Sequence, residues 1–249
     1  VMATNYNPKI VMDGLVVHVD AGNIKSYPGT GKTLKDLSGN GLDLSTTGTF
    51  NTANDADAGT VYDHNGSSSV TTATFSPISS LTWSVIWWIR STGTTSSNFR
   101  HVIRLQDTNA FTGSNYPAYY WQADTRTPSN SYIHEYQRMW NGTTAASNWS
   151  SANVVDSADW NSQAWFCCGV SHNKSVGSDG VFKNYNNGSL KTTRTQTFDV
   201  SGYGDINLLA FNTSNGNTVR MGAVSLYNRV LTDLEFEQNF NALKGRYGY

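Results

Sequence analysis

Short segments with the pattern of β-strands, separated by tight-turn dipeptides, make up most of this sequence. The dipeptides are Asn-Gly or Asp-Gly, which accept the positive φ that a tight hairpin requires. Many short strands with regular turn signals predict a sandwich or barrel rather than a parallel α/β sheet. The expected strands cover residues 15–19, 61–64, 68–74, 81–90, 101–105, 118–123, 132–140, 164–172, 180–185, 196–200, 207–211 and 219–227.

The end of the chain is the one stretch with a clear helical pattern. Thr232 is a good N-cap, and Glu235 three residues later completes a capping box. Gly245 predicts a left-handed end to this helix. The apolar stripe on the helix consists of Phe236, Phe240 and Leu243. We expect this helix to be a structural lock rather than a site.

Composition limits the domain organisation and the partners. The 249 residues fit one large all-β domain, with residues 1–13 as a polar N-terminal arm and residues 14–249 as the folded domain. Charged residues make up 14% of the chain and the net charge is −1, so no basic surface for a nucleic acid is expected. We see no pattern of a signal peptide and no run of about 20 apolar residues for a membrane helix. We therefore expect neither nucleic-acid nor membrane partners.

The two cysteines, Cys167 and Cys168, are neighbours inside an apolar run. Adjacent side chains on a strand point to opposite faces, which makes a disulfide between them geometrically poor. We expect two free thiols packed as small hydrophobic groups, and hence assembly in a reducing compartment.

Four blocks of the sequence carry recognisable motifs in a fixed order. Residues 14–44 contain a strand and a D-x-SGNG loop, and residues 80–90 read SLTWSVIWWIR. Residues 159–190 form a Trp-led hairpin pattern ending in NNGSL, and residues 222–249 contain the YNRVLTDLEF segment. Together these blocks resemble the concanavalin A-like lectin/glucanase superfamily, in particular its laminin G-like jelly rolls. The sequences of both ends of the chain also resemble those of stand-alone laminin G-like virion proteins of tailed phages from marine and cyanobacterial hosts.

This resemblance implies an all-β fold, a concanavalin A-like β-sandwich (jelly roll) of two antiparallel sheets with one short C-terminal helix. It also implies that the first and last strands pair with each other. It also implies a virion structural protein, assembled in the cytoplasm of a bacterial host, that decorates the capsid or tail. Its expected partners are other virion proteins, further copies of itself on the particle, and host-surface polysaccharide. Two alternatives stay open: a carbohydrate-binding module without a structural role, and a glycoside hydrolase or lyase on the same fold.

The acidic residues argue against an enzyme. Glucanases of the superfamily carry an E-x-D-x-E pattern, whose paired carboxylates act as nucleophile and acid. This chain has only three glutamates, Glu135, Glu235 and Glu237, and Glu135 has no acidic residue within five positions on either side. The five histidines are scattered, without the spacing of a zinc site. We expect no enzymatic activity and no catalytic residues.

A calcium ion is the cofactor that the resemblance brings into question. Many laminin G-like domains hold one at a loop rim, and Asp36, Asn40 and Asp43 could offer oxygen ligands here. The alternative is that Asp36 and Ser38 make local side chain to backbone bonds that shape the loop. We favour the alternative, and so expect no metal or other cofactor.

Aromatic residues cluster in the middle of the chain. Lectin-like proteins bind sugars through aromatic faces combined with amide and hydroxyl groups, and strand alternation would give residues 132–140 a polar and aromatic face. The alternative is cross-strand aromatic pairing within the sandwich. The candidate carbohydrate-binding residues are Tyr119, Trp121, Tyr136, Trp140 and Trp149.

Overall fold

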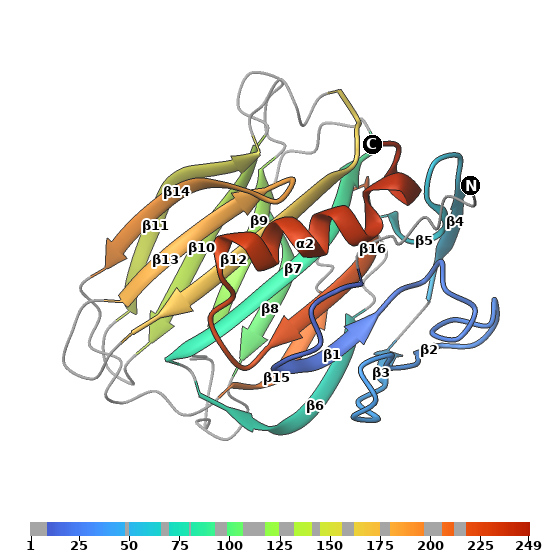
Figure 1. Cartoon of the computed structure of the whole chain (residues 1–249), viewed down its shortest axis with the longest axis horizontal. Coiled ribbons are helices and arrows are strands. Elements are labelled where there is room, and N and C mark those ends of the chain that lie inside the picture. Colours follow the sequence, from blue (N-terminus) through green and yellow to red (C-terminus); the bar gives the residue numbers. More distant parts are fainter. Residues whose placement is uncertain are drawn as a thin grey trace, which may run out of the picture.

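The computed structural model is a sandwich of two antiparallel β-sheets with one helix on an outer face (Figure 1). The described residues are 9–47, 50–65, 70–79, 81–92, 99–106, 118–124, 132–140, 145–155, 162–174, 180–196, 206–211 and 218–249. The predicted all-β sandwich with a short C-terminal helix is therefore confirmed.

The first sheet joins the two ends of the domain. Its strands are β1 (Leu15–Val19), β4 (Thr52–Asp55), β5 (Gly59–Asn65), β7 (Thr82–Ser91), β12 (Phe166–Asn173), β13 (Gly180–Asn186), β14 (Ser189–Gln196) and β16 (Thr218–Tyr227). They follow the order β14-β13-β12-β7-β16-β5-β4, and β1 pairs with β16 beside this path. The predicted pairing of the first and last strands is confirmed by this contact.

The second sheet contains the middle of the chain. Its strands are β2 (Thr33–Leu34), β3 (Leu44–Thr47), β6 (Val70–Ile78), β8 (Phe99–Gln106), β9 (Ala118–Asp124), β10 (Tyr132–Trp140), β11 (Ala145–Val155) and β15 (Ile206–Phe211). Their order is β11-β10-β9-β8-β15-β6-β3-β2. The strands β9, β10 and β11, which carry the five candidate aromatic residues, are thus adjacent at one end of this sheet.

The sequence pattern missed several strands, among them β3, β4, β11 and β14. These segments are rich in Ser, Thr and Asn, as in the SLKTTRTQ of β14, so apolar alternation is absent. Their backbone hydrogen bonds to neighbouring strands make them strands, which is a tertiary effect. Of the strand expected at 196–200, only Gln196 lies within the described residues, as the last residue of β14.

The central strand β7 is buried on both faces. Trp87 and Ile89 belong to the core between the two sheets, whereas Ile86 and Trp88 belong to a second core on the other side. A strand covered on both faces reads as a nearly continuous apolar run, which accounts for SLTWSVIWWIR.

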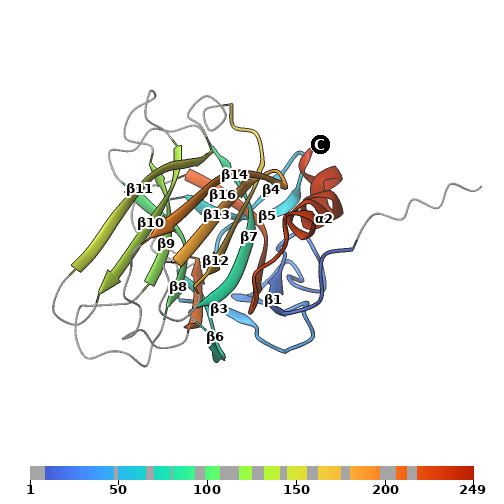
Figure 2. The ribbon, with the colours of Figure 1, turned by 60° about the vertical axis from the view of Figure 1, so that its left-hand side comes forward.

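The second core is closed by α2 (Asp233–Leu243), which lies across the outer face of the first sheet (Figure 2). Phe236 stacks on Tyr185 of β13, with ring centroids 3.7 Å apart. Phe240 stacks on Trp88 of β7 at 5.7 Å. The predicted apolar stripe therefore faces the sheet, and Leu243 is also packed against this core.

The start of α2 follows the prediction, but its end does not. The Thr232 hydroxyl accepts a hydrogen bond from the Glu235 N–H, and the Glu235 carboxylate accepts one from the Thr232 N–H, so the capping box is confirmed. Gly245 is not the left-handed stop: the chain continues through a 3-10 turn at Lys244–Tyr247, and Gly248 takes the left-handed φ of 84°. Neither of these helical segments has the length and apolar character needed to cross a membrane.

The described part of the predicted arm, residues 9–13, lies against the folded domain. Val11 is buried, its N–H donates to Asn239 of α2 at 3.0 Å, and its carbonyl accepts from the Tyr227 hydroxyl at 3.1 Å. The Lys9 carbonyl accepts a further bond from Gln238. These five residues are therefore part of the fold, and the rest of the expected arm lies outside the described residues.

Both cysteines are buried free thiols, as expected. Cys168 contributes to the core between the sheets and Cys167 to the core under α2, so the two side chains point to opposite faces of β12. Burial raises the pKa of both thiols, which keeps them protonated and unreactive.

Glu235 also makes the stability of the helix cap depend on pH. The guanidinium of Arg229 donates two hydrogen bonds to this carboxylate, at 3.0 and 2.5 Å, and lowers the pKa of Glu235 to about 2. A glutamate in an unfolded chain has a pKa of about 4.3. The stabilisation from the Arg229–Glu235 ion pair is therefore present above that pH and is lost as the pH falls toward 2.

We expect Glu235→Gln to lower the free energy of unfolding by about 1 kcal/mol at pH 7 and by less at pH 2.5. Urea unfolding at several pH values measures the difference. Glu237→Gln, an exposed position on the same helix, is the control and should leave the pH profile unchanged. Equal losses at pH 7 and pH 2.5 for Glu235→Gln would contradict the role of the ion pair.

Candidate functional site

Strand pairing in the second sheet brings the candidate aromatic residues into rows. The structure describes their backbone, and their side chains lie outside its described part. Tyr136 of β10 pairs with Tyr120 of β9 on one side and with Trp149 of β11 on the other. Tyr120 in turn pairs with Arg104 of β8. One row of register positions therefore crosses four strands, from Arg104 to Trp149.

The register divides the five predicted residues between two faces. Trp121 pairs with Ile103 and Tyr119 with Leu105, and both partners are fully buried in the core between the sheets. Directly paired residues share a face of the sheet. Tyr119 and Trp121 thus hold positions on the core face.

The other three candidates hold positions on the opposite face. Tyr136 and Trp149 are paired with each other, and Trp140 lies four residues after Tyr136 on the same strand. Arg104 and Tyr120 belong to this face but are absent from the predicted set. Alternation within one strand assigns a face, whereas only the register between strands shows which residues are neighbours, so the sequence could not select them. Sugar binding by the five residues stays a prediction.

The loop with the calcium candidates is held together by its own side chains. The Asp36 carboxylate accepts backbone hydrogen bonds from His18 and Ser38, both at 2.9 Å, and from Leu42 at 3.1 Å. Burial by itself raises the pKa of Asp36, but these hydrogen bonds outweigh it and lower the pKa. Asp43 accepts the Asp36 N–H at 3.0 Å. Both carboxylates thus have local partners that shape the loop.

Asn40 uses its amide nitrogen to hold the loop against β1. The Nδ2 group donates to the carbonyls of Leu15 and Val16, at 2.9 and 2.8 Å. One edge of β1 pairs with β16, and the loop covers the other edge of β1. The described residues contain no group of three or more His, Cys, Asp or Glu side chains placed to hold a metal ion. The contacts described in this loop do not require a calcium ion. The expectation that the protein has no cofactor stays a prediction.

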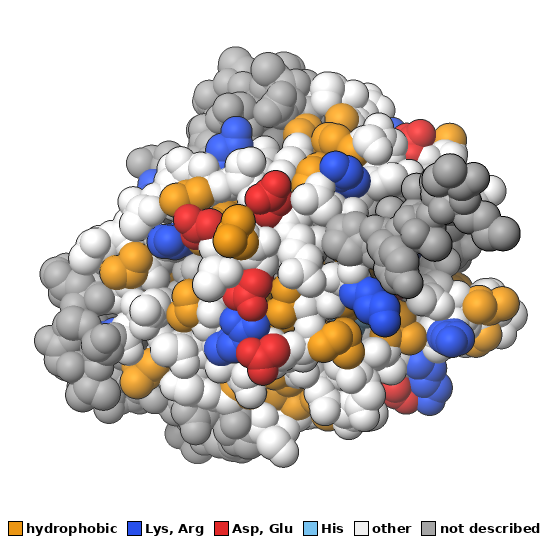
Figure 3. Space-filling model, viewed as in Figure 1, with side chains coloured by type: hydrophobic (Ala, Val, Ile, Leu, Met, Phe, Trp, Pro, Cys, Tyr) orange, Lys and Arg blue, Asp and Glu red, His pale blue; other side chains and the backbone are white. Residues whose placement is uncertain are grey.

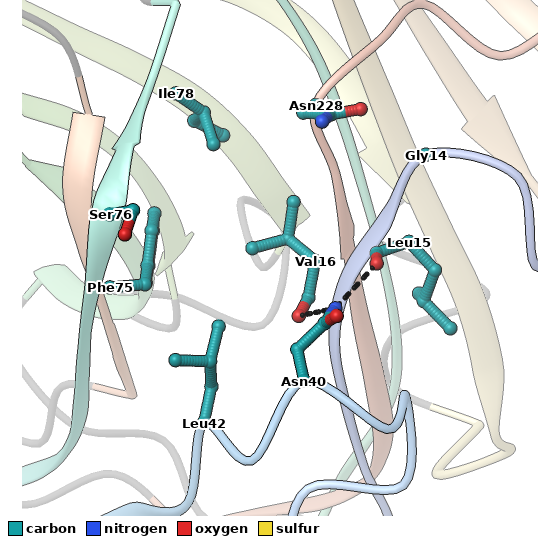
Figure 4. Close-up of a pocket in the computed structure, with 9 residues that line it drawn as sticks. All are labelled: Gly14, Leu15, Val16, Asn40, Leu42, Phe75, Ser76, Ile78 and Asn228. Carbon is teal, nitrogen blue, oxygen red and sulfur yellow. Dashed lines mark hydrogen bonds between the residues drawn. The ribbon is translucent and has the colours of Figure 1, made fainter.

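A pocket of about 420 Å³ opens beside the same loop (Figure 4). The side chains of Val16 from β1, Leu42 from the loop and Ile78 from β6 point toward one another across it. Asn40 and Asn228 lie at its rim, on separate segments. The pocket is therefore assembled from parts far apart in the sequence, and no sequence pattern marked it.

His18 and His172, the two histidines whose side chains the structure describes, are packing residues. His18 Nδ1 lies 2.8 Å from the Ser225 hydroxyl, and both side chains are buried. Burial lowers the pKa of His18, so its ring stays neutral at physiological pH. The His172 ring stacks on Phe182 at 4.2 Å. Neither histidine offers a substrate an accessible base.

The face that carries α2 has a mixed charge pattern. Figure 3 shows basic and acidic side chains interspersed there, with hydrophobic groups scattered between them. The pairs include Lys183–Asp233 at 3.0 Å and Arg229–Glu235 at 2.5 Å. Such pairing leaves no strong field of one sign on this side of the molecule.

Comparisons by sequence find no relative: no protein-family model and no curated protein matches the chain. Comparison of structures finds toxin binding domains. A structure of botulinum neurotoxin type C, whose cell entry is reported to depend on two ganglioside molecules, has a TM-score of 0.64 at 14% identity, covering 94% of this chain and 52% of that chain. The binding domain of Paraclostridial Mosquitocidal Protein 1 has a TM-score of 0.64 at 14% identity, covering 93% of this chain and 52% of that chain.

A sialidase is also similar. The structure of Trypanosoma rangeli sialidase in complex with sialic acid has a TM-score of 0.59 at 12% identity, covering 96% of this chain and 35% of that chain. This chain spans about half the length of the toxin structures it matches. At these identities the likeness concerns the fold alone: the chain has the jelly-roll β-sandwich found in receptor-binding domains of toxins and in part of a sialidase.

Proposed function

We propose that this protein is a non-catalytic carbohydrate-binding module of the lectin-like β-sandwich class. The observation that carries the proposal is the row formed by Arg104, Tyr120, Tyr136 and Trp149 across β8 to β11. Aromatic rings stack on the apolar face of a sugar, while an arginine donates hydrogen bonds to its hydroxyl groups. Two similar structures support the same class of ligand: cell entry of botulinum neurotoxin type C depends on two ganglioside molecules, and the Trypanosoma rangeli sialidase is in complex with sialic acid.

The outward position of the row also supports binding. Ile103 and Leu105, on either side of Arg104, are fully buried, whereas the Arg104 side chain is half-buried. The row is therefore on the face of the second sheet that points away from the core between the sheets. Polar and aromatic positions on paired strands suit a glycan, because backbone that is already fixed by strand pairing loses little conformational entropy on binding.

We expect Tyr136→Ala and Trp149→Ala each to weaken glycan binding at least about tenfold, since one stacked ring contributes on the order of 1–2 kcal/mol. A glycan array screens the wild-type protein, and calorimetry on the strongest hit measures the variants. Tyr249→Ala is the control, because Tyr249 is an exposed aromatic residue on the α2 side of the molecule. A blank array for the wild type, or unchanged binding in both variants with melting temperatures intact, would refute the proposal.

The absence of catalysis is supported by the tasks of the acidic residues. Glu235 is bound by Arg229 and Thr232, and Asp36 is bound by backbone N–H groups of its loop. Asp55 is held by two arginines. These three carboxylates make contacts that stabilise the fold, so none of the three is free to act as the acid or nucleophile of a glycosidase.

We further propose that the protein serves on a virus particle, as a capsid or tail decoration module that meets host-surface polysaccharide. The support is the resemblance of both chain ends to phage virion proteins. Lys9 and Val11 are bonded to α2 and β16, and residues 1–8 are proposed to add as a strand to a neighbouring subunit.

Two truncations separate attachment from folding. Removal of residues 1–8 is expected to abolish incorporation into particles and to leave the melting temperature unchanged. Removal of residues 1–12 is expected to cost a further 2 kcal/mol or so of stability, about the value of burying Val11 and losing its two hydrogen bonds. Particle occupancy is measured by mass spectrometry, and full occupancy without residues 1–8 would contradict their role in attachment.

A further inference from the structure

We propose that the pocket between β1, β6 and the loop at residues 36–43 is a second carbohydrate site, specific for a neutral sugar that carries a methyl group. Acetamido sugars and 6-deoxy sugars form this ligand class. The site shares the ligand class of the proposed function but none of its residues. In the second sheet, β15 lies between β6 of the pocket and β8, which carries Arg104 at the end of the row.

The floor of the pocket is apolar and still accessible. Val16, Phe75 and Ile78 retain 8%, 7% and 8% exposure, although each packs in the core between the sheets. Leu42 is only partly buried and completes the floor (Figure 4). A sugar hydroxyl placed on this floor would lose its hydrogen bonds to water without gaining a partner, which is costly. A methyl group would gain from the same position.

The rim of the pocket supplies hydrogen bonds. The Asn40 amide nitrogen is occupied by β1, but its oxygen has no partner among the described residues. The side-chain amide of Asn228 and the hydroxyl of Ser76 likewise have no hydrogen bond to the described part of the chain. Amides and hydroxyls both donate and accept, which suits sugar hydroxyls and an acetamido group.

Gly14 leaves room for the side chains beside the pocket mouth. It has a φ of 72°, and a Cβ atom there would lie 2.9 Å from the Asn228 side-chain oxygen and 2.9 Å from Cγ of Arg229. A larger residue would therefore displace both side chains, including the Asn228 amide.

Charge and size select the ligand further. The lining described for this pocket contains no Lys, Arg, Asp or Glu, so a carboxylate such as that of sialic acid has no counter-charge there. The volume of about 420 Å³ is in the range of small-ligand clefts, which is about 300–1,000 Å³, and holds one sugar ring with a substituent.

Titration by NMR tests this assignment with four probes: N-acetylglucosamine, fucose, glucose and sialic acid. We expect N-acetylglucosamine and fucose, the two neutral sugars with a methyl group, to bind at least tenfold more tightly than glucose, and sialic acid to leave this pocket empty. The amide signals of Gly14, Val16 and Leu42 should shift on binding. Equal affinity for glucose, or shifts confined to other parts of the protein, would overturn the proposal.

Variants give a second readout. Ser76→Phe should fill the pocket and abolish binding, and Asn228→Ala should weaken it at least threefold. Thr74→Phe, an exposed position on the same strand outside the pocket lining, should bind as the wild type does. Retained binding in folded Ser76→Phe and Asn228→Ala would refute the site.

Trp149→Ala separates this site from the aromatic row. It should leave the pocket ligand unaffected, so loss of methyl-sugar binding in Trp149→Ala alone would overturn the pocket and support the row. Glycan-array binding that persists without any methyl-sugar binding would overturn the pocket alone.

Discussion

Asp55→Ala is expected to lower the free energy of unfolding by about 3–5 kcal/mol, the largest effect of any single substitution considered for this protein. The Asp55 side chain is fully buried, and its Oδ2 atom accepts hydrogen bonds from Arg90 and Arg220, both at 2.9 Å. Its Oδ1 atom accepts from the Trp165 indole at 3.1 Å and from the Ala58 N–H at 3.3 Å. Alanine would leave two guanidinium groups and an indole N–H without their acceptor.

Chemical denaturation of Asp55→Ala measures this loss. Asp57→Ala is the matched control, because Asp57 lies two residues away, is 53% exposed, and approaches Arg90 only to 3.7 Å. It should cost less than about 1 kcal/mol. A loss for Asp55→Ala no larger than that of the control would show that the network is dispensable.

Gly222→Ala is expected to cost about 2–4 kcal/mol by displacing the C-terminal end from the sheet. A Cβ atom at Gly222 would lie 2.0 Å from the Tyr247 hydroxyl and 2.6 Å from its ring. Tyr247 is buried, stacks on Trp88 at 4.0 Å, and accepts a hydrogen bond from the Ala223 N–H at 2.8 Å. All of these contacts would have to shift to admit one methyl group.

Two further variants decide whether the contact with Tyr247 is the cause. Gly245→Ala, where a Cβ atom meets nothing within 4 Å, should change the stability by less than about 1 kcal/mol. In a Tyr247→Ala background, Gly222→Ala should lose most of its effect, because the clash is gone. Thermal unfolding of the four proteins forms the cycle, and additive losses would contradict the mechanism.

Features that depend on a few neighbouring residues could be predicted from the sequence. The capping box links Thr232 and Glu235, three positions apart, and the Asn187-Gly188 turn takes positive φ values of 51° and 78° as expected for this dipeptide. The end of the helix was not predictable in this way. It is decided by the docking of Tyr247 on the sheet, which extends the helical chain past Gly245.

The candidate site shows the same division. Alternation along β10 correctly groups residues of one strand, but the five candidate residues occupy positions on two faces. Only the register between strands pairs Tyr119 with Leu105 on the core face and Tyr136 with Trp149 on the other. A register depends on contacts between distant segments, which no local pattern contains.

By itself, the sequence determined the all-β class, the capped helix, the joining of the first and last strands, and the two free thiols. The tertiary structure alone decided which aromatic residues share a face and how the pocket between Val16, Leu42 and Ile78 is assembled. It also decided that Asp55 forms ion pairs with Arg90 and Arg220. The physical reason is the distance along the chain over which each kind of interaction acts. Backbone preference and side-chain periodicity act over a few residues, whereas pockets, registers and buried ion pairs require segments that the chain brings together only on folding.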